Sequence, residues 1–165
     1  MVKRAATVAP APGRKISPTK QAVIALFGCA DRVRWFFEGL IAPHGITAQQ
    51  YNVLRILRGA EPEGLPTLSI VTRMIERAPG ITRMIDRLET KGLVTRERRD
   101  GDRRCIYCRI TAAGNDLLGK LDAPVDAADQ AAFAMLSKRE LTDLIAMLER
   151  VRDARDVRPQ ELDRE

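Results

Sequence analysis

The residues that could do chemistry in this sequence are mainly arginines and lysines, because histidine, cysteine and aromatic side chains are scarce. The 165 residues include 28 basic and 22 acidic side chains, three cysteines and a single histidine, His44. One imidazole cannot build a histidine-rich metal site, and a Ser-His-Asp or Cys-His catalytic group would depend on that same residue. We therefore expect no catalytic residues, no metal site and no cofactor, which argues against an enzyme.

The basic charge is concentrated in two segments. Residues 1–20 hold five basic and no acidic side chains, and residues 73–109 hold eleven basic and six acidic ones, so the rest of the chain is acidic overall. Lys and Arg clusters contact phosphates and release counterions when a protein binds a polyanion. A solvated charged surface would have the same composition. The predicted elements within residues 73–109 are therefore needed to distinguish a polyanion-binding surface from an ordinary solvated one.

The periodicity of the apolar residues predicts a mainly helical chain. Residues 1–16 lack any periodic pattern and contain several prolines, and we expect them to form a disordered basic tail. A long amphipathic helix is predicted from the Ser17-Pro18 cap to residue 41, ending before Gly45. A capping box at Thr47 and Gln50 begins a second helix.

The middle of the chain predicts a helix-turn-helix followed by a β-hairpin. Thr67 caps a third helix that extends through Ile75, and a fourth follows the break at residues 78–80. The Asp100-Gly101 pair between two β-compatible runs predicts the hairpin. Thr111 caps a fifth helix, which is expected to continue past Pro124 only with a bend or break. A second capping box, Ser137 with Glu140, begins a sixth.

This order of elements is that of a winged helix-turn-helix, in which one helix enters the major groove and the hairpin follows the backbone to the minor groove. The apolar residues Ile81 to Leu88 must face the core, so Thr82, Arg83 and Arg87 project outward. We expect Thr82 and Arg83 to read bases, and Arg77 and Arg87 to contact phosphates. The alternative is that these arginines are surface charges paired with Glu76, Asp86 and Glu89.

The stretch from Ile81 to Val94, the Asp102-Arg103-Arg104 run and the segment Arg109 to Gly114 together resemble the MarR family of bacterial transcriptional regulators. By that resemblance, Arg104 is the wing arginine that enters the minor groove, and Asp102 holds its guanidinium. The other wing residues expected to contact DNA are Arg99 and Arg103. The sequence Ala78-Pro79-Gly80 departs from the Ser or Thr that begins this helix in many members.

The resemblance also implies a homodimer whose N- and C-terminal helices interlock. The expected organisation is a helical dimerisation region at residues 17–45 and 112–165 and a winged helix-turn-helix DNA-binding region at residues 46–111. Two-fold symmetry then implies a pseudo-palindromic site on double-stranded DNA. The alternative is that both apolar stripes are buried within a single chain.

The cysteines have several interpretations. Cys105 and Cys108 form a C-x-x-C motif, but residues i and i+3 of a strand point to opposite faces, which opposes a disulfide between them. Cys29 lies on the first helix, where some relatives sense oxidants, although a buried apolar cysteine is the stronger expectation.

Other members bind small aromatic acids between the dimer helices and the DNA-binding region. The candidates for such a site are Trp35, Phe36, His44 and Arg55, although an aromatic run on a helix is more often core or dimer interface.

The sequence thus predicts a cytoplasmic DNA-binding regulator, a repressor by resemblance, which a small aromatic effector releases from DNA. The fold class is mainly α with a small β-hairpin. The longest uncharged apolar run of the sequence, residues 21–30, is too short to span a membrane. The alternatives are a thiol-based oxidant sensor acting through Cys29 and a winged-helix protein-interaction module.

Overall fold

The computed structural model describes residues 16–75, 80–99 and 102–154, and for residues 99 and 102–104 it describes the backbone alone. In chain order the elements are α1 (Pro18–Ile41), the 3-10 turn η1 (Ala42–His44), α2 (Ala48–Arg58), β1 (Leu65–Pro66), α3 (Thr67–Val71), α4 (Ile81–Thr90), β2 (Val94–Arg99), β3 (Asp102–Ile110), α5 (Ala112–Ala132) and α6 (Lys138–Asp153).

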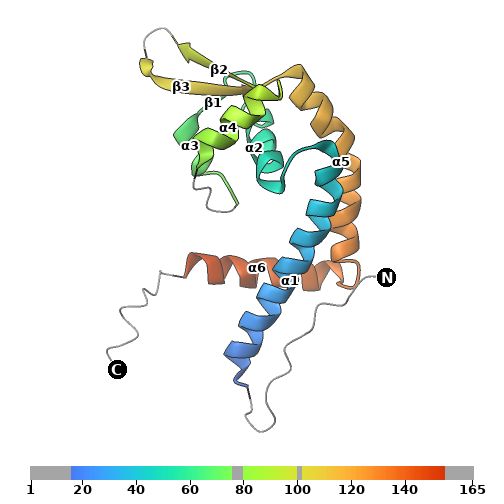
Figure 1. Ribbon diagram of the computed structural model, residues 1–165. Helices are drawn as coiled ribbons and strands as arrows, with labels where there is room; N and C mark the ends of the chain where they lie inside the picture. The colour runs from blue at the N-terminus through green and yellow to red at the C-terminus, as the bar shows by residue number, and fades with distance from the viewer. Residues whose placement is uncertain (1–15, 76–79, 100–101, 155–165) are drawn as a thin grey trace, which may run out of the picture.

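These elements form a lobe and a helical stem (Figure 1). The lobe contains α2, α3, α4 and the small sheet, and the stem consists of α1 and α5, which contact each other as they extend from the lobe. Helix α6 begins near the end of α5 and crosses α1 partway along its length, so that the first turns of α1 extend beyond it (Figure 1). None of the described helices combines the length and apolar character that crossing a membrane requires.

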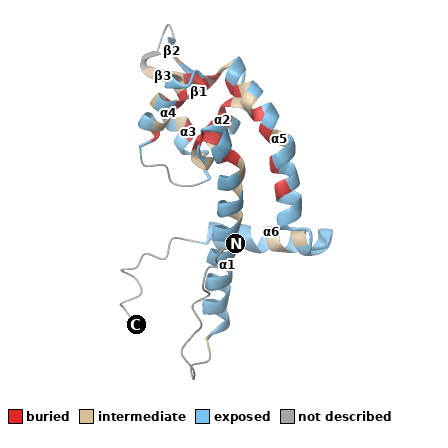
Figure 2. Ribbon diagram, turned by 45° about the vertical axis from the view of Figure 1, so that its right-hand side comes forward, coloured by how far each residue is buried: buried red, intermediate tan, exposed pale blue. Residues whose placement is uncertain are grey.

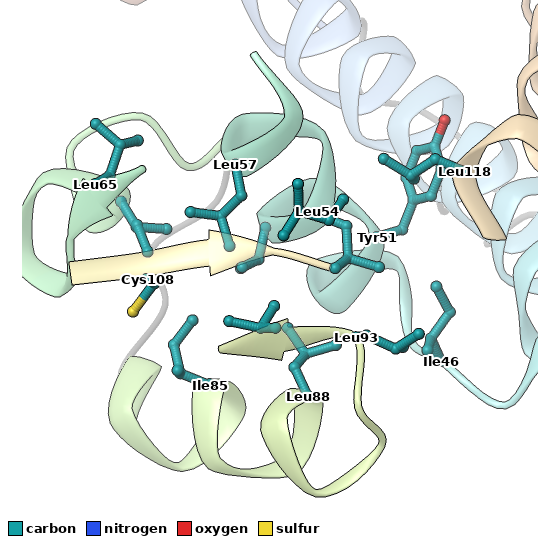
Figure 3. Packing of buried hydrophobic residues seen from close by; sticks show 14 of the residues in the cluster. Ile46, Tyr51, Leu54, Leu57, Leu65, Ile85, Leu88, Leu93, Cys108 and Leu118 are labelled. Carbon is teal, nitrogen blue, oxygen red and sulfur yellow. The ribbon is translucent and has the colours of Figure 1, made fainter. Parts of the chain in front are cut away.

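The hydrophobic core lies in the lobe and along the upper part of α5, as Figure 2 shows by the position of the buried residues. Figure 3 shows side chains from α2, α4 and the sheet meeting in its centre. Among the most deeply buried are Leu54, Leu57, Ile85, Leu88 and Leu118. This packing fixes α4 against the sheet, so the outward face of α4 has a defined orientation.

The sheet has three antiparallel strands in the order β1-β3-β2. The hairpin of β2 and β3 that the sequence predicts is confirmed, with Val94 opposite Ile110 and an irregularity at Arg98 and Arg99. The third strand, β1, consists of only two residues, which pair with Cys108 and Tyr107. Two residues are too few to show the alternation by which a strand is recognised in a sequence.

The predicted helix caps at Ser17, Thr47, Thr111 and Ser137 are confirmed. Ser17 accepts a hydrogen bond from the Lys20 backbone N–H, and Thr47 with Gln50 forms a reciprocal capping box. Thr111 caps α5, and Ser137 with Glu140 forms the second capping box. Each supplies an acceptor for a backbone N–H that the helix itself leaves unpaired.

The third helix is shorter than the sequence predicts, and Thr67 is its first residue rather than its cap. Residue 66 is paired in β1, and the helix ends at Val71. The Thr72 hydroxyl donates to the Ser69 carbonyl, and the next backbone bonds are of the tighter i to i+3 kind. Such local bonding competes with continuation of an α-helix. The predicted extension through Ile75 is therefore wrong.

Helix α5 runs through Pro124 without a break. Pro124 is exposed, whereas Leu121 and Val125 beside it are buried against the core. The buried stripe holds the helix together although proline removes one backbone hydrogen bond. The start of α5 passes close to the sheet, and a Cβ on Gly114 would lie 2.5 Å from the Leu93 carbonyl oxygen. Only glycine fits that approach.

Candidate DNA-binding surface

Helix α4 presents one apolar and one polar face. Ile81, Ile85 and Leu88 are buried, and Met84 is half-buried against the same core. Thr82, Arg83 and Arg87 are exposed. A helix turns by about 100° per residue, so Arg83 and Arg87 lie on one flank of the outward face, whereas Asp86 and Glu89 lie on the flank toward β2.

The carboxylates of α4 are bound by an arginine outside the helix. Arg96 on β2 forms an ion pair of 2.7 Å with Asp86, and its Nε donates to a Glu89 carboxylate oxygen at 2.8 Å. Arg83 and Arg87 have no ion pair or side-chain hydrogen bond with the described part of the chain. The surface-charge alternative requires Asp86 and Glu89 to neutralise these arginines, and they do not. Its third carboxylate, Glu76, lies outside the described residues.

Arg96 is a residue that the sequence analysis missed. It follows Val94 by two positions, so both side chains point to the face of the sheet that α4 covers. Val94 is buried in the core, and Arg96 lies where that core ends, opposite the buried Cys108. The available signal was a charged residue at an inward-facing strand position, which needs a charged partner.

The charge on this cluster is stabilised by the contact. The hydrogen bond from Arg96 lowers the pKa of the Glu89 carboxyl, outweighing its partial burial. The bond to Glu89 likewise raises the pKa of Arg96, with a smaller contribution from Asp86. Both shifts favour the charged forms of Glu89 and Arg96.

The C-terminal end of α4 is anchored by hydrogen bonds to other parts of the chain. The Lys91 ammonium donates to the Gly45 carbonyl in the turn after α1. The Thr111 hydroxyl donates to the Gly92 carbonyl at 2.7 Å, which ties the same end to the start of α5. The position of this end is therefore set by the stem as well as by the core.

The wing is the β2-β3 hairpin, which projects from the lobe beside α4 (Figure 1). The backbone of Arg99 pairs with that of Asp102, and Arg103 and Arg104 follow on β3, so four predicted DNA-contacting positions lie near its tip. Their side chains lie outside the described residues, as do Arg77 and the Asp100-Gly101 turn. Their roles in binding DNA remain predictions.

The four candidate effector residues are all exposed in this chain. Trp35 is 66% exposed and Phe36 is also exposed on α1. His44 is exposed in η1, and Arg55 lies on α2 with its guanidinium bound to the Tyr51 hydroxyl at 2.9 Å. No hydrogen bond or ion pair joins these four side chains within the described residues, and a shared effector site stays a prediction.

The cysteines are free thiols in three different environments. Cys108 is buried and Cys105 is half-buried, on opposite faces of β3 as predicted. Burial raises the pKa of the Cys108 thiol, which keeps it protonated. Cys29 is exposed, so the expectation that it is buried is wrong for the single chain, in which none of the described elements covers this side chain.

The stem carries a large apolar surface that the described part of the chain leaves uncovered. Ile41 is the sole fully buried residue of α1, and α6 has none. A hollow of about 510 Å³ lies between the end of α5 and α6, lined mainly by Phe133, Leu141, Leu144, Ile145 and Leu148. The alternative that both stripes are buried within one chain does not hold.

The fold and the basic face of α4 define a winged helix-turn-helix DNA-binding protein. Residues 46–106 match the MarR family model. The chain is 32% identical over 108 residues to an uncharacterized HTH-type transcriptional regulator of Bacillus subtilis, covering 65% of this chain and 68% of that protein. It is 26% identical over 126 residues to the homoprotocatechuate degradative operon repressor of Escherichia coli, covering 76% and 84%.

Solved structures agree with this assignment. A MarR transcription factor from Planctomyces limnophilus is 40% identical, with a TM-score of 0.64 over 82% of this chain and 98% of that one. A mutant MarR of Escherichia coli complexed with operator DNA shares the fold at 22% identity, with a TM-score of 0.71 over 79% and 93%. The protein belongs to the MarR family of DNA-binding transcriptional regulators.

Proposed function

We propose that this protein is a homodimeric transcriptional repressor that recognises a pseudo-palindromic operator through α4 and the wing. The observation that carries the proposal is the charge arrangement on α4. Arg83 and Arg87 are exposed and unpaired in the described structure, whereas the two carboxylates of the helix are bound by Arg96. The face that would meet phosphates and base edges is therefore positive.

The uncovered apolar surface of the stem supports the homodimer. Exposed apolar side chains extend along α1 and α6, and the hollow beside α6 is almost wholly apolar, which favours an apolar helix as its occupant. We infer that a second copy covers this surface. Residues 17–45 and 112–165 would then form the dimerisation region, and residues 46–111 would bind DNA.

Repression and an aromatic effector are supported by what similar proteins do. The Escherichia coli relative is a repressor of a degradative operon. A structure with the same fold, 22% identical and with a TM-score of 0.74, concerns regulation of DNA binding of Bordetella bronchiseptica BpsR by 6-hydroxynicotinic acid. By analogy, a small aromatic acid would bind near the junction of stem and lobe, with Arg55 as the cation for its carboxylate. The protein would act in the cytoplasm.

Selection of bound duplexes from a random pool tests the central claim. The full chain is expected to recover an inverted repeat whose half-sites are about one helical turn apart. The mass of the complex should correspond to two chains per duplex. Recovery of no preferred sequence at low salt would overturn the proposal and favour a winged-helix protein-interaction module.

A further inference from the structure

Arg96 holds one flank of α4 through two carboxylates, whereas the hydrophobic core and the contacts at the helix end hold other parts of this helix. Each of its three guanidinium nitrogens has a carboxylate partner: Nη1 contacts Asp86, and Nε and Nη2 contact the same oxygen of Glu89. The two acids are three residues apart and lie on one flank of α4. A planar guanidinium that binds both restricts rotation of the helix about its own axis.

The other anchors of α4 act elsewhere. Apolar contacts of Ile85 and Leu88 hold the inner face, and the bonds of Lys91 and Thr111 hold the C-terminal end. Arg96 fixes the flank that carries Asp86 and Glu89 to the wing. This contact links the helix expected to read the major groove to the strand that supports the wing.

The same contact controls the sign of the charge on the outward face. Asp86 and Glu89 are both partly exposed, so without a cation beside them they would oppose the approach of phosphates. Arg96 is only 27% exposed and is already engaged, which leaves Arg83 and Arg87 as the freer cations of this face. Burial and pairing both separate the role of Arg96 from theirs.

We propose that Arg96 is a positioning residue for operator recognition, which sets the rotation of α4 relative to the wing and neutralises the two carboxylates on its flank. It acts on specificity through α4 and makes no base contact itself. This inference rests on the proposed function, because it concerns discrimination between operator and random duplex.

The test compares operator and random-duplex affinities across variants at several salt concentrations. Arg96→Gln keeps the approximate length of the side chain and removes the charge. Operator affinity is expected to fall about tenfold and the ratio of operator to random affinity about fivefold, because α4 loses its orientation and two carboxylates face the duplex. Arg98→Gln is the matched control, since Arg98 is an exposed arginine on the same strand with no carboxylate partner in the described structure. It should leave that ratio unchanged.

Neutralising the carboxylates separates the two effects of Arg96. In Arg96→Gln/Asp86→Asn/Glu89→Gln, random-duplex affinity should return close to that of the parent. Discrimination between operator and random duplex should stay low, because the ion pairs that orient α4 are still absent. In Asp86→Asn/Glu89→Gln, which retains Arg96, random-duplex binding should strengthen while discrimination falls. This double variant carries the test even where Arg96→Gln folds poorly, which melting curves would reveal.

Two results would overturn the inference. The first is an unchanged affinity ratio in both Arg96→Gln and Asp86→Asn/Glu89→Gln. The second is a loss in Arg96→Gln that is equal for both duplexes and independent of residues 86 and 89, since this would make Arg96 an ordinary phosphate contact. A parent protein that selects no operator would instead contradict the proposed function.

Discussion

Arg58 on α2 donates two hydrogen bonds, each 2.8 Å long, to the two carboxylate oxygens of Asp122 on α5. The two residues are 64 positions apart in the sequence, and their pairing joins the lobe to the stem. A second polar contact follows along α5, where the Asn115 amide donates to the Glu61 carboxylate at 3.0 Å. The orientation of the lobe on the stem therefore depends on specific polar contacts as well as on the core.

Removing the charge of Asp122 should weaken folding in a pH-dependent way. The hydrogen bonds from Arg58 hold the pKa of the Asp122 carboxyl below its ordinary value. A lowered folded-state pKa adds stability above the unfolded-state value of about 4, and that stability disappears as the pH falls through the folded-state pKa. Both side chains are about a third exposed, so screening limits the contribution.

We expect Asp122→Asn to lower the free energy of unfolding by about 0.5 to 1 kcal/mol at pH 7. Urea denaturation at pH 7 and at pH 3 measures this, and the difference from the parent should shrink at the lower pH. Asp126→Asn is the control, because Asp126 is an exposed residue of the same helix without a described partner. Equal effects of the two substitutions would contradict a specific role for the pair.

Arg83→Ala should reduce discrimination between operator and random duplex. A bidentate contact to a base would make the cost about 1 to 3 kcal/mol for the operator. Arg87→Ala, if Arg87 contacts phosphate, should weaken both duplexes alike and lower the salt slope by about one. Fluorescence anisotropy over a salt series measures both, with the exposed Arg139→Ala on α6 as control. The assignment of roles fails if the two variants behave identically.

Arg104→Ala should weaken operator binding substantially while the dimer and its melting temperature remain those of the parent. The expected reason is loss of a minor-groove contact from the wing, where a guanidinium is drawn to the negative potential between phosphates. Gel shifts and thermal melts on the same preparation measure the two properties. Full retention of affinity would refute the wing assignment.

Phe27→Arg should convert the proposed dimer to a monomer. Phe27 is 71% exposed on α1. In a two-fold symmetric dimer the substitution occurs in both copies, so it would bury two charges at the interface. Leu68→Arg is a matched control, because Leu68 is 79% exposed on α3 in the lobe, away from the stem. Light scattering should give about 18.4 kDa for the Phe27 variant and twice that mass for the control. A dimeric Phe27→Arg protein would exclude this face from the interface.

Peroxide treatment should act alike on the parent and on Cys29→Ser. Cys108 is buried with a raised pKa, which disfavours the reactive thiolate there. Exposed Cys29 is the thiol that a sensor mechanism would use, and in the proposed dimer it lies on a helix that the second copy covers. DNA binding titrated against peroxide measures the response. Protection by Cys29→Ser would support the oxidant-sensor alternative.

Local sequence signals were sufficient for most elements of this fold. Capping residues at Ser17, Thr47, Thr111 and Ser137 mark helix starts because each satisfies backbone groups within a few residues of itself. The period of the apolar residues sets which face of α4 is buried, so the exposure of Arg83 and Arg87 also followed from the sequence.

Only the tertiary structure decided the features that depend on contacts between distant segments. The strand β1 exists because residues 65 and 66 meet β3, and beyond the end of α3 the Ile75 backbone N–H donates to the Asn52 side chain on α2. The pairing of Arg96 with Asp86 and Glu89 likewise depends on contact between two separate elements, β2 and α4. Sequence spacing predicts neighbours within one helix or strand, whereas the partner of a charged side chain across two elements is set by how those elements pack.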